Sequence, residues 1–437
     1  MNKKLIASAI GMLLAANGAF AQSAGNNSVE LYGIIDLGVG HVENSLSTDG
    51  NFPASVNPVS ATKTSIGNSV TGMFNGGISD SRWGVRGTED LGGGMKAFFT
   101  LESGFDATDG ALNNGTAALA NNSPKASTVS ANTSLDGQLF NRQAFVGISA
   151  GELGSIALGR NYAPFFDIAV AYDPVQNAQL FSPLGFSGTI GGGGGVSEDT
   201  RVDNSIKYKN TIGGVNFGAL YKFGGVAGST SAESGYTLNV GYEAGPFGIQ
   251  AAYENFTDAL KTGNSTVAGD ISVTDYNTDA FMIAAKYTFG EATIRGGFEE
   301  YTLKTPSDSV AALGITSLYG YTIGNSTTFA QANQTTDVLW IGGDYNFTPS
   351  LNLAVGFYDQ NPKQSDDYVA SATSTLPKVG QADGNIYSYS ALLDYHFTKR
   401  TDVYAGMMYS QYKGDNYPSS VYNSSNYIVA FGMRTKF

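Results

Sequence analysis

The sequence ends in Tyr427-Ile-Val-Ala-Phe-Gly-Met-Arg-Thr-Lys-Phe437, and this stretch decides the fold. Its odd-numbered residues are mostly large and apolar, whereas the even-numbered ones become small and then basic. Because successive side chains of a strand point to opposite sides, the stretch predicts a strand between an apolar and a polar environment. The same alternation recurs along the chain, and no helical pattern supplies a core. It therefore predicts a closed barrel in a membrane, with lipid outside and water inside.

The composition agrees with a single barrel. Charged residues make up 14% of the 437 residues, well below the roughly 25% that is typical of soluble domains. The mean hydropathy of −0.11 is too polar for a helical membrane protein, and alternating lipid-facing and lumen-facing positions produce such an average. No linker and no change in composition or alternation pattern divides the chain, so one large domain is predicted.

Residues 1–21 are predicted to be a secretory signal peptide, which leaves residues 22–437 as the barrel domain. Lys3 and Lys4 supply the positive segment, residues 5–14 the apolar segment and Ala19-Phe-Ala21 the cleavage site. Cleavage removes both lysines and takes the formal net charge from −13 to −15. No later segment approaches 18 apolar residues, so no membrane-spanning helix is predicted. The absence of cysteine excludes a disulfide framework.

The alternation marks sixteen antiparallel strands. Their predicted ranges are 29–40, 79–90, 94–104, 138–149, 153–161, 200–209, 214–224, 235–244, 246–256, 276–289, 291–303, 335–347, 350–360, 384–397, 401–413 and 426–437. Near the strand ends the outward residue is often aromatic, which predicts a girdle at the membrane boundary. The girdle residues are Phe223, Phe289, Phe347, Phe397 and Phe437.

The connections alternate between tight and long. Tight ones, such as Gly290-Glu291 and Thr348-Pro-Ser350, follow every even-numbered strand. The connections after odd-numbered strands are 41–78, 105–137, 162–199, 257–275, 304–334, 361–383 and 414–425, with 225–234 as a shorter exception. This rhythm predicts short periplasmic turns, long extracellular loops and two periplasmic termini.

Several phrases along the chain carry a family resemblance. They are Val29-Glu-Leu-Tyr-Gly-Ile-Ile-Asp36, Ser81-Arg-Trp-Gly-Val-Arg-Gly-Thr-Glu-Asp-Leu-Gly-Gly-Gly94, Leu101-Glu-Ser-Gly-Phe105, Phe140-Asn-Arg-Gln-Ala-Phe-Val-Gly147, Leu158-Gly-Arg-Asn-Tyr162, Arg201-Val-Asp-Asn-Ser-Ile-Lys-Tyr208 and the terminal Phe437. In this order the chain resembles the trimeric general porins of Gram-negative bacteria, especially those of β-proteobacteria.

The resemblance implies a 16-stranded homotrimer in the cell outer membrane. It implies passive transport of ions and small hydrophilic solutes, with the third long loop folded into the lumen. It also implies contact with outer-membrane lipid and lipopolysaccharide, and insertion by the outer-membrane assembly machinery, for which Phe437 is the signal. The physical indication for a trimer is that outward residues of the first strands are small, such as Gly33, Ala97 and Ala157.

The basic wall of the pore constriction is predicted to comprise Arg82, Arg86, Arg160 and Arg201. Alternation turns Arg82 and Arg86 inward, and also Arg201, because Val202 is expected to face lipid. By resemblance, Arg82, Arg160 and Arg201 form the family's basic cluster. Strict alternation puts Arg160 on the lipid side, but Gly159 provides a place for the pleat to break. Arg86 has an alternative role, in which it pairs with a neighbouring carboxylate and stiffens the wall.

The acids of the third loop, Asp167 and Asp173, are expected to face this wall. Arginines opposite carboxylates would create a transverse field in a narrow aqueous gap, and charges there set ion preference. The loop tip, Phe181 to Gly188, lacks the acids that enteric family members carry, which are replaced here by Leu184 and by Ser187 or Gly188. Selectivity stays open on these grounds, with a slight preference for anions at the constriction.

Other functions are less well supported by the sequence. The chain has two histidines, His41 and His396, and alternation places no nucleophile beside either, so no enzyme is predicted. Two distant histidines without cysteine indicate neither a metal site nor a cofactor. The acidic net charge disfavours nucleic acid as a partner. A substrate-specific channel remains an alternative, given inward Tyr32, Tyr301, Tyr358 and Tyr404, and so does adhesion through the loops.

Overall fold

The structure is a computed structural model that describes residues 27–45, 68–110, 112, 139–184, 200–264, 271–304, 317–318, 321–328, 334–363, 385–413 and 425–437. The predicted signal peptide and most of the predicted loop 105–137 lie outside these residues. Among the described residues, no helix has the length and apolar composition needed to cross a membrane.

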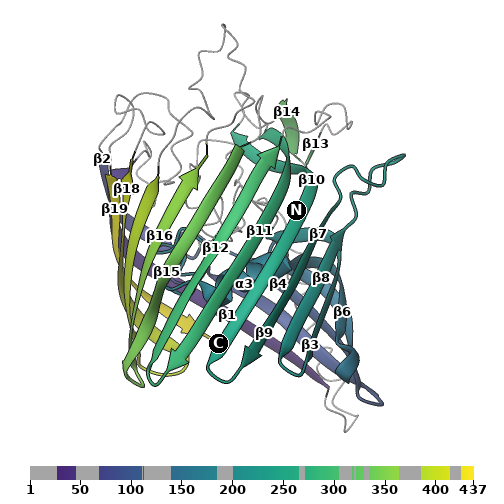
Figure 1. The fold of residues 1–437 in the computed structure, drawn as a ribbon, viewed down its shortest axis with the longest axis horizontal. Coiled ribbons are helices and arrows are strands. Elements are labelled where there is room, and N and C mark those ends of the chain that lie inside the picture. Colours follow the sequence, from purple (N-terminus) through teal and green to yellow (C-terminus); the bar gives the residue numbers. More distant parts are fainter. Residues whose placement is uncertain are drawn as a thin grey trace, which may run out of the picture.

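An antiparallel sheet closes on itself to form a barrel (Figure 1). The first strand, β1 (Ser28–Ser45), pairs with the last strand, β19 (Ser425–Lys436), which completes the closure. On its other side β1 pairs with β2 (Asn68–Asn75) and then with β3 (Arg82–Gly92). These two form one strand of the wall, interrupted at residues 76–81.

The rest of the wall follows in chain order. It comprises β4 (Met95–Gly104), β5 (Gln143–Ala150), β6 (Ser155–Tyr162), β7 (Arg201–Ile212), β8 (Val215–Lys222), β9 (Gly235–Ala244), β10 (Phe247–Asn264), β11 (Ile271–Phe289), β12 (Ala292–Lys304), β15 (Gln334–Thr348), β16 (Leu351–Pro362), β17 (Ile386–His396) and β18 (Thr401–Tyr412). The short β13 (Ser317–Leu318) and β14 (Tyr321–Thr328) are not strands of the wall; β14 pairs in parallel with the start of β11 at the loop end of the barrel. The predicted 16-stranded antiparallel barrel is confirmed.

Several predicted connections contain strands, including β13 and β14 within the predicted loop 304–334. The predicted loop 257–275 is mostly strand, because β10 continues to Asn264 and β11 begins at Ile271. Likewise, part of the predicted loop 41–78 is strand, at the end of β1 and in β2. The backbones of these extensions pair in register, the end of β10 with the start of β11 and the end of β1 with β2.

The tight turns are as short as predicted (Figure 1). The turn between β11 and β12 uses Gly290 at φ 57°, and the turn between β9 and β10 uses Gly245 at φ 55°. A two-residue hairpin turn requires such positive φ angles, which glycine adopts without steric cost. Glycine at these positions therefore fixes the register of the strands on either side.

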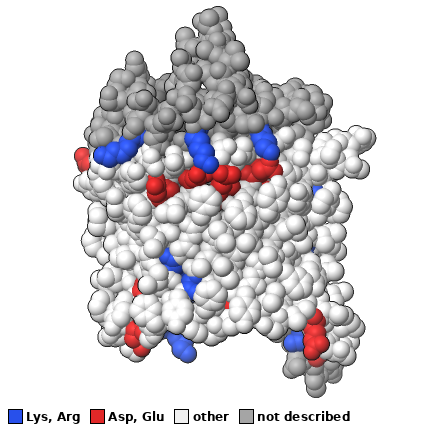
Figure 2. Space-filling view, viewed as in Figure 1, with Lys and Arg blue, Asp and Glu red and all other residues white. Residues whose placement is uncertain are grey.

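The two faces of the wall differ as the alternation predicts. On β19, the side chains of Phe431 and Met433 are 64% and 54% exposed on the outer surface, whereas Ile428 and Ala430 are fully buried inside. The five predicted girdle residues are all exposed. Figure 2 shows an outer surface with few charged side chains between two charged rims. An apolar band between polar rims is the surface that a lipid bilayer requires.

Alternation fails where a strand is irregular. Asn204 has a φ of 53°, and the register between β6 and β7 shifts at this level. As a result Val202, which was expected to face lipid, is fully buried inside the barrel together with Phe165. Ala157 was also wrongly placed on the outer face, because its neighbours Ile156 and Leu158 are the exposed residues.

The segment after β6 folds into the barrel. Helix α3 (Pro164–Tyr172) lies inside the wall (Figure 1) and buries Phe165 and Ile168 against Met282 and Trp340 of β11 and β15. The chain then crosses to the opposite side of the lumen. There Phe181 packs in a second apolar cluster with Phe74, Tyr404 and Ile428 from β2, β18 and β19.

Candidate functional site

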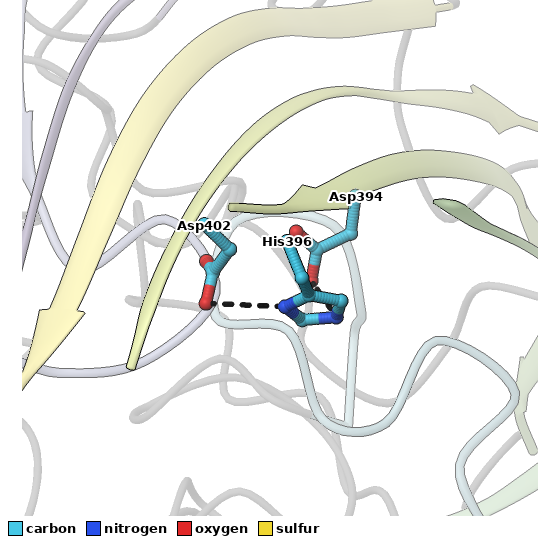
Figure 3. Close-up of side chains that lie close together, drawn as sticks. All are labelled: Asp394, His396 and Asp402. Atoms are coloured by element: carbon cyan, nitrogen blue, oxygen red, sulfur yellow. Dashed lines mark ion pairs between the residues drawn. The ribbon is translucent and has the colours of Figure 1, made fainter. Parts of the chain in front are cut away.

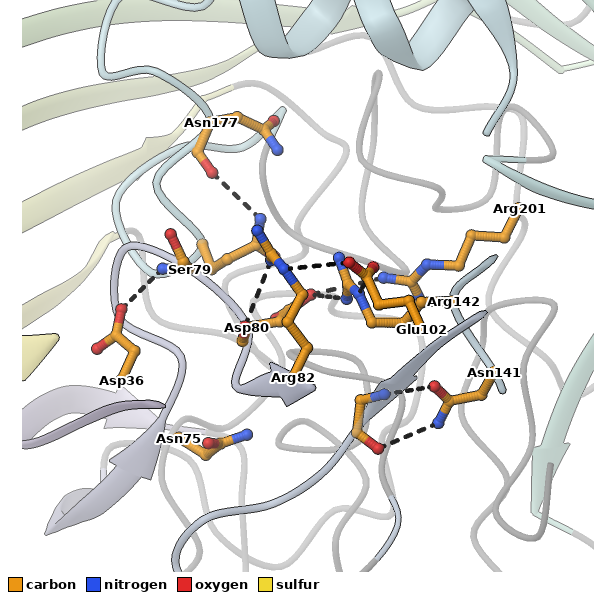
Figure 4. Close-up of polar contacts among 12 residues, drawn as sticks. Asp36, Asn75, Ser79, Asp80, Arg82, Glu102, Asn141, Arg142, Asn177 and Arg201 are labelled. Carbon is orange, nitrogen blue, oxygen red and sulfur yellow. Dashed lines mark hydrogen bonds and ion pairs between the residues drawn. The ribbon is translucent and has the colours of Figure 1, made fainter. Parts of the chain in front are cut away.

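Five charged residues meet on the inner side of the wall near the start of β3 (Figure 4). They are Asp80, Arg82, Glu102, Arg142 and Arg201, here called the charge cluster. Arg142 is at its centre: its Nη1 lies 2.7 Å from Oδ2 of Asp80, and its Nε lies 2.8 Å from Oε1 of Glu102. Arg201 lies 3.5 Å from Asp80, and Arg82 lies 3.6 Å from Glu102. Three guanidinium groups therefore share two carboxylates.

Burial distinguishes the members of this charge cluster. The side chains of Asp80, Glu102, Arg142 and Arg201 are all at most 6% exposed, whereas that of Arg82 is 25% exposed. Buried charges are tolerated only when they are paired and hydrogen-bonded, and Arg142 meets this condition by also donating to the Tyr162 hydroxyl at 2.7 Å. Arg82 is thus the member that reaches furthest into solvent.

The interruption between β2 and β3 places Asp80. Gly76 adopts a φ of 82°, and the chain then turns inward through residues 77–81. The carboxylate of Asp36 on β1 holds this turn by accepting hydrogen bonds from the backbone N–H groups of Ile78 (2.9 Å) and Ser79 (2.8 Å). A side chain thereby replaces the ladder partners that the break removes.

Arg160 is turned away from lipid by a bulge in β6. Gly159 has a φ of 132°, and the register with β7 shifts between Gly159 and Asn161, so the pleat breaks where the sequence indicated. Arg160 is 5% exposed, donates to Oδ1 of Asp203 at 2.6 Å and donates to the backbone carbonyls of Asn141 and Arg201. It therefore supports the strand ends that carry the charge cluster.

Arg86 lies apart from the charge cluster. Its Nε is 2.8 Å from Oε2 of Glu30, with both side chains more than half exposed, and its guanidinium stacks on the ring of Tyr32. This geometry matches the alternative role, in which Arg86 pairs with a neighbouring carboxylate.

Asp167, on α3, interacts with lysines of β7. Its Oδ2 lies 2.7 Å from Nζ of Lys207 and 3.0 Å from Nζ of Lys209. Burial opposes ionisation of Asp167, but the two ammonium groups outweigh burial and lower the pKa of this carboxyl group. Asp167 is therefore a charged anchor that ties the loop to lysines of the wall rather than to its arginines.

Asp173, which follows α3, is fully buried. It accepts a hydrogen bond from the Tyr358 hydroxyl at 2.6 Å and another from the backbone N–H of Asn177 at 2.5 Å. Burial raises the pKa of Asp173 to about 6, although these hydrogen bonds oppose the rise. This residue also anchors the loop instead of facing the arginines.

The sequence analysis did not single out Arg142 or Asp80. Strict alternation with the exposed Val146 and Ile148 would place Arg142 on the lipid side, but β5 begins only at Gln143. Asp80 lies in the interruption between β2 and β3, where no strand period applies. The available signal was the phrase Phe140-Asn-Arg-Gln143, which carried the resemblance without a role for its arginine.

The comparisons with known proteins agree with this architecture. A family model described as Gram-negative porin matches residues 7–415. Outer membrane porin protein 32 of Delftia acidovorans is 30% identical over 309 residues, which cover 70% of this chain and 71% of the relative. An outer membrane porin protein of Bordetella pertussis is 30% identical over 287 residues, which cover 63% of each chain.

A solved structure shares the fold. The anion-selective porin from Comamonas acidovorans superposes with a TM-score of 0.62 at 21% identity, covering 94% of this chain and 100% of that one.

Proposed function

Because the chain belongs to the family of Gram-negative porins and lies in the outer membrane, we propose that it is a general diffusion pore for ions and small hydrophilic solutes. The closed wall with an apolar exterior separates its interior from lipid. The observation that carries the proposal is the charge cluster on the inner face, because paired charges beside a partly exposed Arg82 suit a lumen that contains water. A porin is a channel, and we infer no catalytic role.

We further propose that the constriction favours anions. Among the described residues here, five basic side chains form ion pairs with three acids. The basic residues are Arg82, Arg142, Arg201, Lys207 and Lys209, and the acids are Asp80, Glu102 and Asp167. Asp173 is buried behind Tyr358 and does not offset this excess of positive charge. Charges that line a narrow pore set its ion preference. The selectivity named for the Comamonas porin points in the same direction.

Single-channel recording in a planar bilayer under a KCl gradient tests both proposals. We expect an ohmic open state and a reversal potential of the sign that chloride permeation gives. Arg82→Gln should move the reversal potential towards the value for potassium. Arg86→Gln should leave the reversal potential unchanged, because Arg86 pairs with Glu30 outside the charge cluster. A barrel that does not conduct would contradict the diffusion pore, and a potassium-selective wild type would contradict the anion preference.

The substrate-specific alternative is less well supported. Tyr301, Tyr358 and Tyr404 are buried, and Tyr32 and Tyr404 donate to Glu102 and Asp36. A sugar channel needs aromatic faces exposed along its path, and these rings are occupied in packing. Block of the current by one sugar would nevertheless favour this alternative. Loop-mediated adhesion concerns segments that lie largely outside the described residues.

A homotrimer is the assembly that we propose. Aromatic pairs mark the periplasmic ends of β11, β15 and β17, as in Tyr345–Phe347, whose ring centroids are 5.0 Å apart. The outer faces of β5 and β6 are instead aliphatic, with Val146, Ile148, Ile156 and Leu158 all exposed. A sector without headgroup-binding aromatics is suited to contact a neighbouring subunit rather than lipid. We therefore place the subunit interface at β5 and β6.

The remaining partners are proposed from the two ends of the wall. The backbone of Phe437 exchanges two hydrogen bonds of 3.1 Å with Gly33, which places the terminal residue where β1 and β19 close the barrel and supports its role as an assembly signal.

Near one rim, Figure 2 shows acidic side chains with basic ones just beyond them. Lys363, directly after the end of β16, pairs with Glu300 and Asp337. Lysines and acids suit lipopolysaccharide phosphates and their bridging cations.

A further inference from the structure

Three potential metal ligands meet at the tight turn between β17 and β18 (Figure 3). Asp394 and His396 end β17, and Asp402 lies near the start of β18, directly opposite His396 in the register. Asp394 and Asp402 are buried on the inner face, where Leu392 and Tyr404 also point. The group therefore lies inside the barrel, at the end that carries the tight turns.

The spacing suits one cation. Nε2 of His396 is 3.6 Å from Oδ2 of Asp394, Nδ1 is 3.7 Å from Oδ2 of Asp402, and one ligand atom from each residue lies within 4.8 Å of the others. Zinc binds nitrogen and oxygen at about 2.0–2.2 Å, so tetrahedral ligands lie about 3.3–3.6 Å apart. The His396 side chain is 37% exposed, and each of its ring nitrogens lies near one of the carboxylates, so a rotation of the ring would direct one nitrogen between them.

Asp394 provides an independent indication. It is 9% exposed, yet its Oδ1 accepts no hydrogen bond within the described part of the chain. A buried acceptor without a donor is costly, and native proteins usually satisfy such an atom with water or an ion. In Figure 3 the carboxylate lies beside the imidazole ring, where a bound cation would contact it.

Arg434 orients the second carboxylate. Its Nε and Nη2 donate to Asp402 at 3.1–3.2 Å, and Nη2 lies 3.6 Å from Oδ2 of Asp394. Hydrogen bonds of this kind hold metal-ligating carboxylates in place. Arg434 and the nearby Lys436 also balance the two acids, so a bound cation competes with them and binds with moderate rather than tight affinity.

We propose that Asp394, His396 and Asp402 form a binding site for a divalent transition metal, with water as the remaining ligand. An imidazole with two carboxylates suits Zn²⁺ or Co²⁺, whereas Mg²⁺ and Ca²⁺ prefer oxygen ligands alone. Neither the family assignment nor the pore proposal requires this site. Its occupation would add positive charge at the periplasmic mouth and strengthen the preference for anions.

Calorimetric titration of the purified protein with Zn²⁺, together with the visible absorption of added Co²⁺, tests the site directly. We expect one metal per chain with micromolar affinity. His396→Ala and Asp394→Asn should weaken binding by more than about tenfold, the loss that even outer-sphere changes can produce. His41→Ala is the matched control, because His41 is the other histidine of the chain and bonds to Thr71 and Glu43 on the extracellular side. Equal affinity in wild type and His396→Ala would overturn the proposal, as would no binding at millimolar Zn²⁺.

A channel measurement separates this proposal from the diffusion pore. Zn²⁺ on the periplasmic side should shift the reversal potential towards chloride in wild type and His41→Ala, but not in His396→Ala. An equal shift in all three proteins would place the metal elsewhere and contradict the site. A wild type that binds Zn²⁺ but carries no current would contradict only the pore proposal, since the titration does not depend on conduction.

Discussion

The hydroxyl of Tyr358 on β16 donates a hydrogen bond of 2.6 Å to Oδ1 of Asp173, the residue that caps the C-terminal end of α3. A carboxylate at this end of a helix is unfavourable, because the carbonyl groups there are already negative. The neighbouring Trp340 donates from Nε1 to the carbonyl of Tyr172 at 3.1 Å. The wall thus supplies two hydrogen-bond donors to this buried helix end.

Removal of the Tyr358 hydroxyl should loosen the inserted loop. Tyr358→Phe leaves one buried carboxylate oxygen without its donor, at a cost of about 1–3 kcal/mol. We expect more current noise in single-channel recordings and faster proteolysis of the segment that follows α3. Tyr389→Phe is the control, because that hydroxyl belongs to a side chain 47% exposed on the outer face. Equal noise in the two variants would contradict the anchoring role.

Loop docking should respond to pH through Asp173. Burial raises the pKa of this group to about 6, while the pKa of an aspartate in an unfolded chain is about 3.9. Between these values the folded protein binds more protons than the unfolded chain, so the Asp173 contribution to stability rises as pH falls through this window. Above this pH window, Asp173 is ionised in the folded protein, and the full free-energy cost of burying its charge lowers the stability. The difference in unfolding midpoint between wild type and Asp173→Asn should change between neutral pH and about pH 4; a constant difference would refute the assignment.

Arg142 should be the most sensitive member of the charge cluster. Arg142→Met removes the nearest ion-pair partner of both Asp80 and Glu102 and leaves the longer ion pairs to Arg201 and Arg82. Loss of one partner from a buried ion pair costs about 3–5 kcal/mol, and urea unfolding in detergent measures it. Arg86→Gln removes a solvent-exposed pair, for which about 1 kcal/mol or less is expected. Similar losses in the two variants would show that burial does not set the energy.

Asp167 should limit the preference for anions. Asp167→Asn removes the carboxylate between Lys207 and Lys209 and leaves the 57% exposed Lys209 without this partner. The reversal potential in a KCl gradient should move further towards chloride. Glu30→Gln, which removes an equal charge from the exposed pair with Arg86, should have a smaller effect. A shift towards potassium would contradict the proposed location of Asp167 beside the conducting path.

The subunit interface can be tested by labelling single cysteines, because the chain has none of its own. Fluorophores at Ile148→Cys on β5 and at Ile283→Cys on β11 both start from exposed outward side chains. A quencher dissolved in the lipid should reach position 283 freely and position 148 weakly, because a neighbouring subunit covers β5. Equal quenching at the two positions would place the interface elsewhere.

The strands could be predicted from sequence because the outer face meets one uniform environment. Within the lipid-facing band, outward positions such as Phe281 and Ile283 on β11 and Phe431 and Met433 on β19 are apolar, whatever the rest of the barrel does. The inner face has no such uniformity, since α3 and residues 175–184 cover parts of it with apolar side chains. Inward residues such as Met282 and Trp340 are therefore as apolar as outward ones, and periodicity cannot report what they contact.

The candidate site was less predictable because its contacts lie at irregular positions. Gly159 and Asn204 shift the alternation of inward and outward side chains, and Arg142 precedes its strand. Strict alternation therefore assigns the residues near these positions to the wrong face of the wall. The partner of Arg142, Asp80, lies 62 residues away. A pairing over that distance depends on how the barrel closes, which no local pattern specifies.

The crossing of the lumen by α3 and its following segment has a consequence for the order of folding. Its two apolar clusters use residues from β10–β12 and from β18 and β19, and Trp340 lies 168 residues after the carbonyl that it binds. Contacts between such distant segments must await loop closure, so the loop settles only after the last strands have inserted. The chain has two tryptophans, and each reports a different step of folding. Trp83, on the wall, reports insertion, and Trp340 becomes buried only in the final step, so fluorescence should resolve two phases in that order.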